Sequence, residues 1–445
     1  MPILERLLPI IRQSAAVLPC LLLISFTAVA SAQISLSPAV DLAQKSSPGV
    51  RSAEANVRRA TAGLDESRDT FWPSVNLGSS VGPPPYGFPL GNPDIYDINA
   101  QSLVFSFSQR DYIRGARIGL RAANLNLQDA KQQVALDVSL AYVELDHDLN
   151  EIAALDQEKS YGSSLVSIEQ DRVGAGVDPR VDELQAELTA AQVDAKRIHL
   201  ENDADEMRQK IAHLTGLPTD GLQTLSSSIP SFPSFAGQPD TDDHLMDANA
   251  GLAATYANAQ SRFFVAFGDE RQNNHPSVGF GFKYQRFAKY ENFAAYYHNF
   301  QQNNISAGIQ LSIPLFDSSL RAKARQSSAQ AAEAQAQADQ SRDLLSEQTF
   351  AARRTIREMA AEQRVALIQS ELAQEQLKTI DAELANGPGS PTAQQVSPVT
   401  AQKAHIEERE RYEDLLDTNF SLIKVELNLL RMTGQIDNWV RSSLK

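Results

Sequence analysis

The stretch RVGAGVDPRVDELQAEL, residues 172–188, decides the fold because it interrupts a helical pattern that is otherwise very long. Gly174, Gly176 and Pro179 are the helix breakers here: two glycines can supply the positive-φ conformations of a helix C-terminus, and the proline prevents direct continuation. A second helix restarts at once, and its apolar positions step by four and three, as in a coiled-coil seam: Leu184, Leu188, Ala191, Ala195 and Ile198. The sequence therefore predicts a long helical hairpin with this turn at its tip.

The composition indicates a large folded protein rather than a disordered one. Of the 445 residues, 42% are hydrophobic and 21% are charged, and the formal net charge is −15. An acidic chain without clustered Lys and Arg argues against nucleic acid as a partner, because phosphate binding depends on such clusters. Beyond the N-terminus no apolar run reaches the roughly 18 residues of a membrane-spanning helix, so none is predicted in the mature chain.

The N-terminus has the features of an export signal. Arg6 and Arg12 precede an apolar run that ends in Ala30-Ser31-Ala32, where small residues suit a signal peptidase. We expect residues 1–32 to be a signal peptide that is cleaved after Ala32, so the chain is exported. Cys20, the only cysteine, lies inside the apolar run, and its lipidation is a minor alternative.

The rest of the chain divides into two structural repeats joined by a linker. The first repeat, residues 33–217, has helical spacing that changes to strand-like alternation and back. Its expected elements are a helix over 36–70, strands over about 73–82 and 98–108 with an aromatic loop over 86–96 between them, and a helical hairpin over about 112–216. Residues 218–244 are rich in Ser, Pro, Gly and Asp and form the expected linker.

The second repeat, residues 245–434, follows the same plan. Its expected elements are a helix over 245–269, strands over about 277–287 and 304–315, and a helical hairpin over about 318–433 with a breaker cluster around Gly387. Both hairpins end in Thr-Gly, at Thr215-Gly216 and Thr433-Gly434, where the glycine stops the helix. Residues 435–445 are expected to form a short C-terminal tail.

The strands of the second repeat alternate apolar residues with small or polar ones, as a sheet with one apolar face requires. Four strands are too few to close a barrel, which needs about eight, and an open sheet edge is not tolerated inside a bilayer. Association of several subunits removes the edges, so we predict a β-barrel that the subunits build jointly. The alternative is the inner face of a soluble sandwich. The expected lipid-facing residues are Phe280, Phe282, Ile309, Leu311 and Ile313.

In this order of elements the chain resembles the TolC-like outer membrane efflux protein (outer membrane factor) family along nearly its whole mature length. The likeness rests on an opening helix that contains Pro48 and ends at Trp72-Pro73, on the tip residues 172–176 followed by 181–187, and on the duplicated plan. The resemblance implies an α+β membrane protein that forms a homotrimer. It further implies a trimeric 12-stranded β-barrel in the cell outer membrane, with a coiled-coil barrel of α-helices that extends into the periplasm.

The resemblance also implies partners. These are outer-membrane lipid around the barrel, a periplasmic adaptor (membrane fusion) protein, and an inner-membrane pump of the RND or ABC type. The adaptor would dock on the tips of the two hairpins: Val173, Gly174, Ala175, Gly176 and Gly387. The alternative for the glycines is that they only stop a helix.

Three further positions are expected at the tunnel mouth: Asp182, Thr400 and Lys403. Aligning the two Thr-Gly endings places Thr400 opposite Asp182. In family members with an acidic ring at the mouth, the carboxylates of the second repeat fall at the positions of Thr400 and Lys403. Neither residue is acidic here, so the sequence argues against such a ring.

No catalytic or cofactor site is expected, and the chain is predicted not to be an enzyme. The seven histidines lack the spacing of metal ligands, and the mature chain has no cysteine to join them, so no metal site is expected. The predicted function is a passive channel-tunnel of a tripartite export system for small, drug-like molecules. The alternatives are a duct for type I protein secretion and a structural coiled-coil envelope protein without channel activity.

Overall fold

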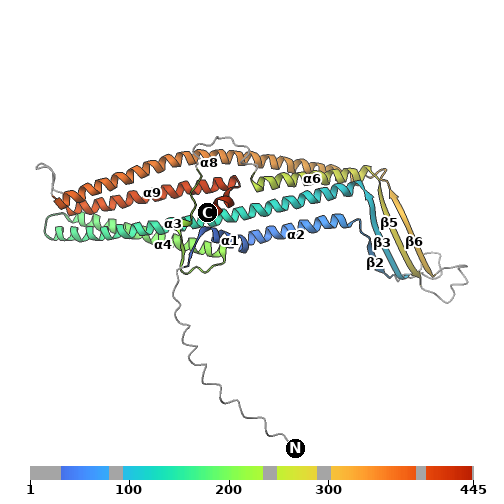
Figure 1. The fold of residues 1–445 in the computed structure, drawn as a ribbon, viewed down its shortest axis with the longest axis horizontal. Helices are drawn as coiled ribbons and strands as arrows, with labels where there is room; N and C mark the ends of the chain where they lie inside the picture. The colour runs from blue at the N-terminus through green and yellow to red at the C-terminus, as the bar shows by residue number, and fades with distance from the viewer. Residues whose placement is uncertain (1–31, 80–93, 234–247, 288–301, 387–396, 443–445) are drawn as a thin grey trace, which may run out of the picture.

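The computed structural model describes residues 32–79, 94–233, 248–287, 302–386 and 397–442. Four strands lie together at one end of an elongated molecule, and the turn between α3 (Phe107–Gly174) and α4 (Arg180–Thr215) lies at the other (Figure 1). The predicted signal peptide, with Cys20, lies outside the described residues except for Ala32.

Long helices make up most of the chain. α3 has 68 residues and α8 (Ser318–Asn386) has 69, so each is about 100 Å long at about 1.5 Å per residue. Shorter helices pack beside them, including α6 (Ala250–Asn274) and α9 (Pro398–Met432). None of the helices in the described ranges combines the length and the apolar character needed to cross a membrane. Each long helix connects the sheet with the far end of the molecule (Figure 1).

The helix expected over residues 36–70 is in fact two helices, α1 (Leu36–Ser46) and α2 (Pro48–Asp69). Ser47 between them has φ −57° and ψ 128°, because a following proline disfavours the α region for the residue before it. Pro48 then occupies the first position of α2, where its missing N–H would have had no partner within the helix. The proline expected inside one helix therefore begins a second one.

One apolar core joins the helices in the middle of the molecule. α1, α3, α4, α9 and the short helix α10 (Ile436–Ser442) all contribute buried side chains: Leu36, Val40, Val138, Leu145, Ile211, Leu427, Leu430, Ile436 and Trp439. Within the expected C-terminal tail, residues 436–442 form a helix packed into this core.

Tyr142 of α3 connects this core to the chain between the two repeats. Its hydroxyl accepts a hydrogen bond from Leu225 N at 2.7 Å. Close by, β1 (Ala32–Ile34) and β4 (Leu222–Thr224) pair in parallel. The first part of the expected linker, up to residue 233, thus includes a strand and buried contacts rather than a loose connection.

Strands from both repeats form one antiparallel sheet in the order β2 (Ser74–Gly78), β3 (Asp94–Ser106), β5 (Ser277–Phe287) and β6 (Asn303–Ser312). The β3–β5 pairing joins the two repeats. β2 and β6 are the edges, and neither has a second partner among the described strands.

The strands of the first repeat differ from the expected bounds. β3 begins at Asp94, so Tyr96 lies in a strand and not in the aromatic loop. β3 ends at Ser106, because the hydroxyl of Ser106 accepts a hydrogen bond from Gln109 N at 3.3 Å and caps α3. The long helix therefore starts five residues before the expected Tyr112.

Substituting the two glycines that end the hairpins should lower the free energy of unfolding by different amounts. Gly216 (φ 78°) and Gly434 (φ 68°) both have the left-handed conformation. A Cβ at Gly216 would meet nothing within 4 Å, whereas a Cβ at Gly434 would clash with the backbone carbonyl of Ala248. We expect Gly216→Ala to lower the free energy of unfolding by about 1–2 kcal/mol, the cost of a left-handed residue, and Gly434→Ala to lower it by more. Denaturant unfolding measures both, and equal costs would contradict the packing at Gly434.

Candidate functional site

The turn between α3 and α4 is closed by backbone hydrogen bonds to the last carbonyls of α3. Val177 N donates to Arg172 O at 2.9 Å, and Gly176 N donates to Val173 O at 3.0 Å. With Gly176 at φ 72°, these bonds form a Schellman motif. Gly174 is the last helical residue of α3 and does not have positive φ. The expectation that both glycines adopt positive φ is therefore wrong for Gly174.

An ion pair holds the two sides of this turn together. Arg172 Nη2 donates to Asp178 Oδ1 at 3.1 Å, and Arg172 Nε donates to Asp178 Oδ2. The hydrogen bonds from Arg172 lower the pKa of the Asp178 carboxyl group. Pro179 then caps α4, with Asp182 N donating to Pro179 O at 3.0 Å. The tip predicted to dock an adaptor is thus a compact turn, and Val177 on it is 62% exposed.

The tip of the second hairpin is described from its α9 side, and Gly387 lies outside the described residues. The hydroxyl of Ser397 accepts from Thr400 N at 3.2 Å and lies 2.9 Å from Thr400 Oγ1, so Thr400 takes part in the N-cap of α9. Lys403 is exposed, and its charge acts on Glu169 and Asp178 of the first tip. The start of α9 therefore lies against the first tip.

Three carboxyl groups meet beneath the first tip: Glu169, Asp178 and Asp182. One oxygen from each lies within 4.8 Å of the others. Burial, and then the charge of Asp178, raise the pKa of Glu169. The structure thus gathers Asp182 and Lys403, two of the predicted tunnel-mouth residues, around Glu169, which the sequence did not single out.

The four-stranded sheet has one apolar and one polar face. Over the middle of the sheet, the register places these mostly apolar residues on one face: Val75, Leu77, Ile98, Ala100, Ser102, Val278, Phe280, Phe282, Tyr284, Ile305, Ala307, Ile309 and Leu311. The polar face has amides, charges and glycines at the alternate positions: Asn76, Asn99, Gln101, Gly279, Gly281, Lys283, Gly308 and Gln310. Ile309 is 77% exposed and Leu77 is 73% exposed. The described chain therefore leaves the apolar face uncovered.

Four of the five predicted lipid-facing residues lie on this apolar face. Phe280 and Ile309 are direct cross-strand partners, Phe282 follows on β5, and Leu311 pairs with Val278. Ile313 follows the last residue of β6 and is 53% exposed. The geometry brings the five residues to one region, and their contact with lipid stays a prediction.

α4 packs against the bundle with a different face from the one expected. Its buried residues are Ala186, Val193, Ala204, Met207, Ile211, Ala212 and Thr215. The residues of the expected seam, Leu184, Leu188, Ala191, Ala195 and Ile198, are all exposed. The heptad spacing is real, but α3 does not cover this row. α4 therefore presents an apolar seam without a partner in the described chain.

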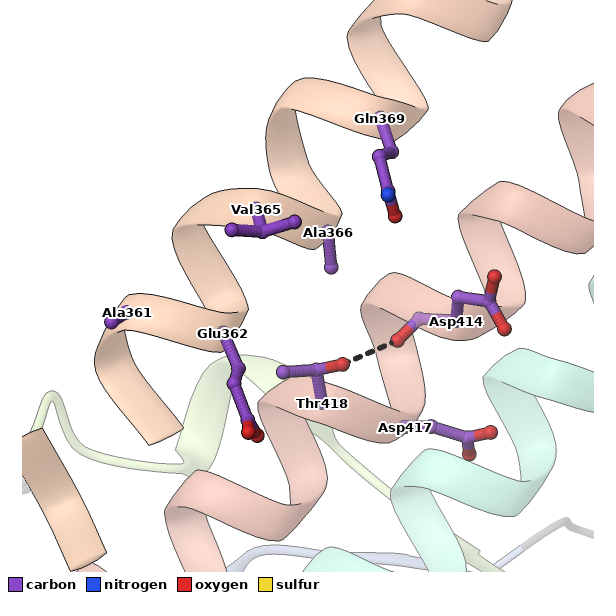
Figure 2. A pocket seen from close by; sticks show the side chains of 8 residues that line it. All are labelled: Ala361, Glu362, Val365, Ala366, Gln369, Asp414, Asp417 and Thr418. Atoms are coloured by element: carbon purple, nitrogen blue, oxygen red, sulfur yellow. Dashed lines mark hydrogen bonds between the residues drawn. The ribbon is translucent and has the colours of Figure 1, made fainter. Parts of the chain in front are cut away.

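α8 has a similar unpartnered row. Val365, Ile368 and Leu372 step by three and four and are each about half exposed. Figure 2 shows Val365 beside a groove of about 530 Å³ between α8 and α9, with Glu362 on the α8 side and Asp414 on the α9 side. The groove is shallow and mixed in character, so its shape suits side chains of another helix better than an enclosed ligand.

A network of charged side chains lies between α3, α4 and α9. Lys196 Nζ is 2.7 Å from Glu151 Oε1 and 2.7 Å from Glu413 Oε2. His147 Nε2 is 3.3 Å from Glu151 Oε2 and 3.2 Å from Asp417 Oδ1. His147, Glu151 and Asp417 are close enough to hold a metal ion, yet Lys196 already supplies a positive charge to Glu151. The group is therefore best described as an ion-pair network.

The surroundings of two groups in this region favour their protonated forms. Burial alone would lower the pKa of His147, but hydrogen bonds to Asp417 and Glu151 outweigh burial and raise it to about 9. Burial, and then the charge of Glu413, raise the pKa of Glu158 to about 8. The bundle thus favours an imidazolium ion at His147 and a neutral carboxyl group at Glu158.

A known protein family matches part of the first half of the sequence. Residues 39–217 match the family model described as outer membrane efflux protein. This range contains α3, α4 and the turn between them, and the family resemblance predicted from the sequence is confirmed there. No curated protein matches the chain in sequence.

Solved structures match the fold over about nine-tenths of the chain. The outer-membrane channel OprN has a TM-score of 0.72 at 18% identity, covering 91% of this chain and 90% of its own. CusC, whose structures concern transmembrane channel formation, has a TM-score of 0.73 at 13% identity, covering 91% and 92%. The outer membrane protein VceC from Vibrio cholerae has a TM-score of 0.72 at 16% identity, covering 90% and 96%. At these identities the likeness is one of fold.

The two tip glycines should respond differently to substitution. Gly176→Val places a β-branched side chain at positive φ and should lower the free energy of unfolding by about 1–2 kcal/mol or more. Gly174→Ala has open space and a helical backbone, so it should be neutral or stabilise by about 0.5–1 kcal/mol. Thermal unfolding and amide exchange at the tip measure the two effects. Equal destabilisation by both variants would contradict the Schellman turn.

The pKa shifts predict that the bundle loses stability as the pH rises. Glu158 is protonated in the folded state up to about pH 8 but ionises near 4.5 when exposed, and His147 keeps its proton up to about pH 9 instead of 6.5. The folded state therefore binds more protons over this range, and its stability falls as the pH rises toward 9. We expect Glu158→Gln to reduce the loss between pH 6 and 9 by about 1–2 kcal/mol after solvent screening. An unchanged pH profile in this variant would show that Glu158 is ionised at neutral pH.

Proposed function

We propose that this chain is one subunit of a homotrimeric duct in the outer membrane, through which small, drug-like molecules leave the cell envelope. The strands of three subunits would close a joint barrel in the outer membrane, and the helices would extend it as a tunnel into the periplasm. The duct is passive and performs no chemistry, because the energy for transport would come from a pump in the inner membrane.

The observation that carries the proposal is the sheet with one apolar face and two open edges. A hydrocarbon environment satisfies the exposed apolar face, and the polar face with its glycines suits a water-filled interior. A lipid-exposed edge is not tolerated in a bilayer, so the edge strands β2 and β6 need partners from other copies of the chain. Four strands from each of three subunits give a barrel in the usual size range of such proteins.

The exposed seams on α4 and α8 support association of the helices as well. The α4 row that includes Leu184 and Leu188 has the spacing of a coiled coil, as does the α8 row that includes Val365 and Leu372. In a ring of subunits, α4 of one copy would pack against α8 of the next. Each leucine removed from water would contribute about 1.5–3 kcal/mol to assembly.

The compact tip between α3 and α4 supports docking of a periplasmic adaptor. Val173 is half-buried, while Gly174, Ala175 and Gly176 are exposed at the end of the molecule farthest from the sheet. Small residues there allow close approach of a partner helix. The adaptor would connect the duct to a pump of the RND or ABC type. Gly387, in the other tip, is proposed for the same surface.

Type I secretion of a polypeptide is the alternative use of the same duct, and the family resemblance is compatible with both cargoes. A structural coiled-coil protein of the envelope is the rival from another class. That rival leaves the uncovered apolar face of the sheet without a role, because a purely helical scaffold has no need of it.

Assembly and conduction test the proposal together. The mature chain, purified from outer membranes in detergent, should run as a trimer and produce discrete conductance steps in a planar bilayer. Glu substitution at both Leu184 and Leu188 should abolish trimers, because the charges would be buried in the α4 seam. The matched double variant with Met at both positions keeps the apolar area and should still assemble. A soluble monomer that forms no channels would refute the duct.

The class of cargo needs a second measurement. A strain that lacks the chain should accumulate a fluorescent dye and regain efflux when the wild-type gene is restored. Unchanged dye efflux, together with loss of a secreted polypeptide from the medium, would assign the duct to protein secretion instead.

A further inference from the structure

We infer that Glu169, Asp178 and Asp182, beneath the α3–α4 tip, form a binding site for a hard divalent cation, with Ca²⁺ preferred over Mg²⁺. The donor set consists of carboxylate oxygens, which such ions prefer. This inference goes beyond the proposed duct. The three residues belong to one chain, so cation binding can be measured whether or not the protein conducts.

The distances fit one ion. One oxygen from each carboxyl group lies within 4.8 Å of the others. Oxygens that share a Ca²⁺ ion lie about 2.3–2.6 Å from it, and therefore at most about twice that distance from one another. A Ca²⁺ ion can thus contact all three groups with little movement, and water can complete its shell. Mg²⁺ should bind more weakly, because it needs a tighter octahedral shell at about 2.0–2.1 Å and gives up water reluctantly.

The burial of Glu169 is an independent indication that its carboxyl group needs a further binding partner. The residue is 2% exposed, and its Oε2 atom is buried with no hydrogen-bond partner among the described residues. The other part of the carboxyl group interacts with Asp178. A buried carboxylate oxygen without a donor is costly unless a cation or a proton compensates its charge. The raised pKa of Glu169 agrees with this, since burial and the charge of Asp178 both disfavour the ionised form.

The two positive charges near the site, Arg172 and Lys403, do not fully neutralise the three carboxylates, so a divalent ion can still be attracted. Arg172 is engaged with Asp178 across the turn, but each carboxylate oxygen has a further lone pair for a metal. Lys403 is exposed and acts on the group through its charge, so it is a mobile competitor rather than a fixed ligand. Three carboxylates against these two cations leave the group negative. The C-terminal end of α3 adds further negative potential.

Calorimetric titration of the full, EGTA-treated chain with CaCl₂ tests the site directly. We expect one saturable site per chain, with weaker binding of MgCl₂ than of CaCl₂. Glu169→Gln and Asp182→Asn should each reduce the Ca²⁺ affinity by about tenfold or more, since loss of an outer-sphere partner alone typically costs that much. Lys403→Gln should increase the affinity, because it removes a competing charge.

Glu206→Gln is the matched control. Glu206 is an exposed carboxylate on the same helix, α4, far from the tip, so its loss changes the net charge equally and should leave the affinity unchanged. Circular dichroism confirms that each variant is folded. Absence of saturable binding to the wild-type chain would overturn the inference. So would an affinity that is the same in the wild type and in folded Glu169→Gln and Asp182→Asn variants.

Discussion

The rest of the structure depends on one constraint: a backbone N–H or C=O group that leaves water must find a hydrogen-bond partner. The outward-facing backbone of β2 and β6 finds none in the described chain. The apolar side chains on the same sheet are exposed as well, and the proposed joint barrel would place them against lipid and pair both edges. The helical part shares this property, because the heptad rows of α4 and α8 are exposed in a single chain. The open strand edges and the exposed helix seams both fit the proposed association of several copies of the chain.

Much of this fold could be predicted because its signals are local and periodic. The alternation in β5 and β6 identifies both strands to within a few residues, and β5 has the expected bounds. The long helices follow from uninterrupted heptads between Gly and Pro breakers. Periodicity specifies which residues share a face, and the register of the sheet confirms that Phe280 and Ile309 do so. It does not specify what covers that face.

The remaining features could not be predicted because they depend on contacts between distant segments. The α4 seam illustrates this: Leu184 and Leu188 have coiled-coil spacing, but the bundle instead covers the face that contains Ala186 and Val193. α10 has too few residues for a periodic signal, and it is a helix because Trp439 packs into a core assembled from the whole chain. Glu169 lies three residues before Arg172, yet only the folded turn brings Asp178 back against it.

The charge at the tip depends on residues from both hairpins, so the residue at one aligned position does not determine it. Lys403 is a predicted tunnel-mouth residue at a position where the family resemblance implies an acidic residue in some members, and taken alone it argues against an acidic mouth. In the folded chain the start of α9 lies against the first tip, and the charge of Lys403 acts on Glu169 and Asp178. This end of the molecule therefore does have a group of carboxylates, which the first hairpin contributes within one chain. A group held by a single chain can bind a cation before subunits assemble, whereas a ring made by several subunits exists only after assembly.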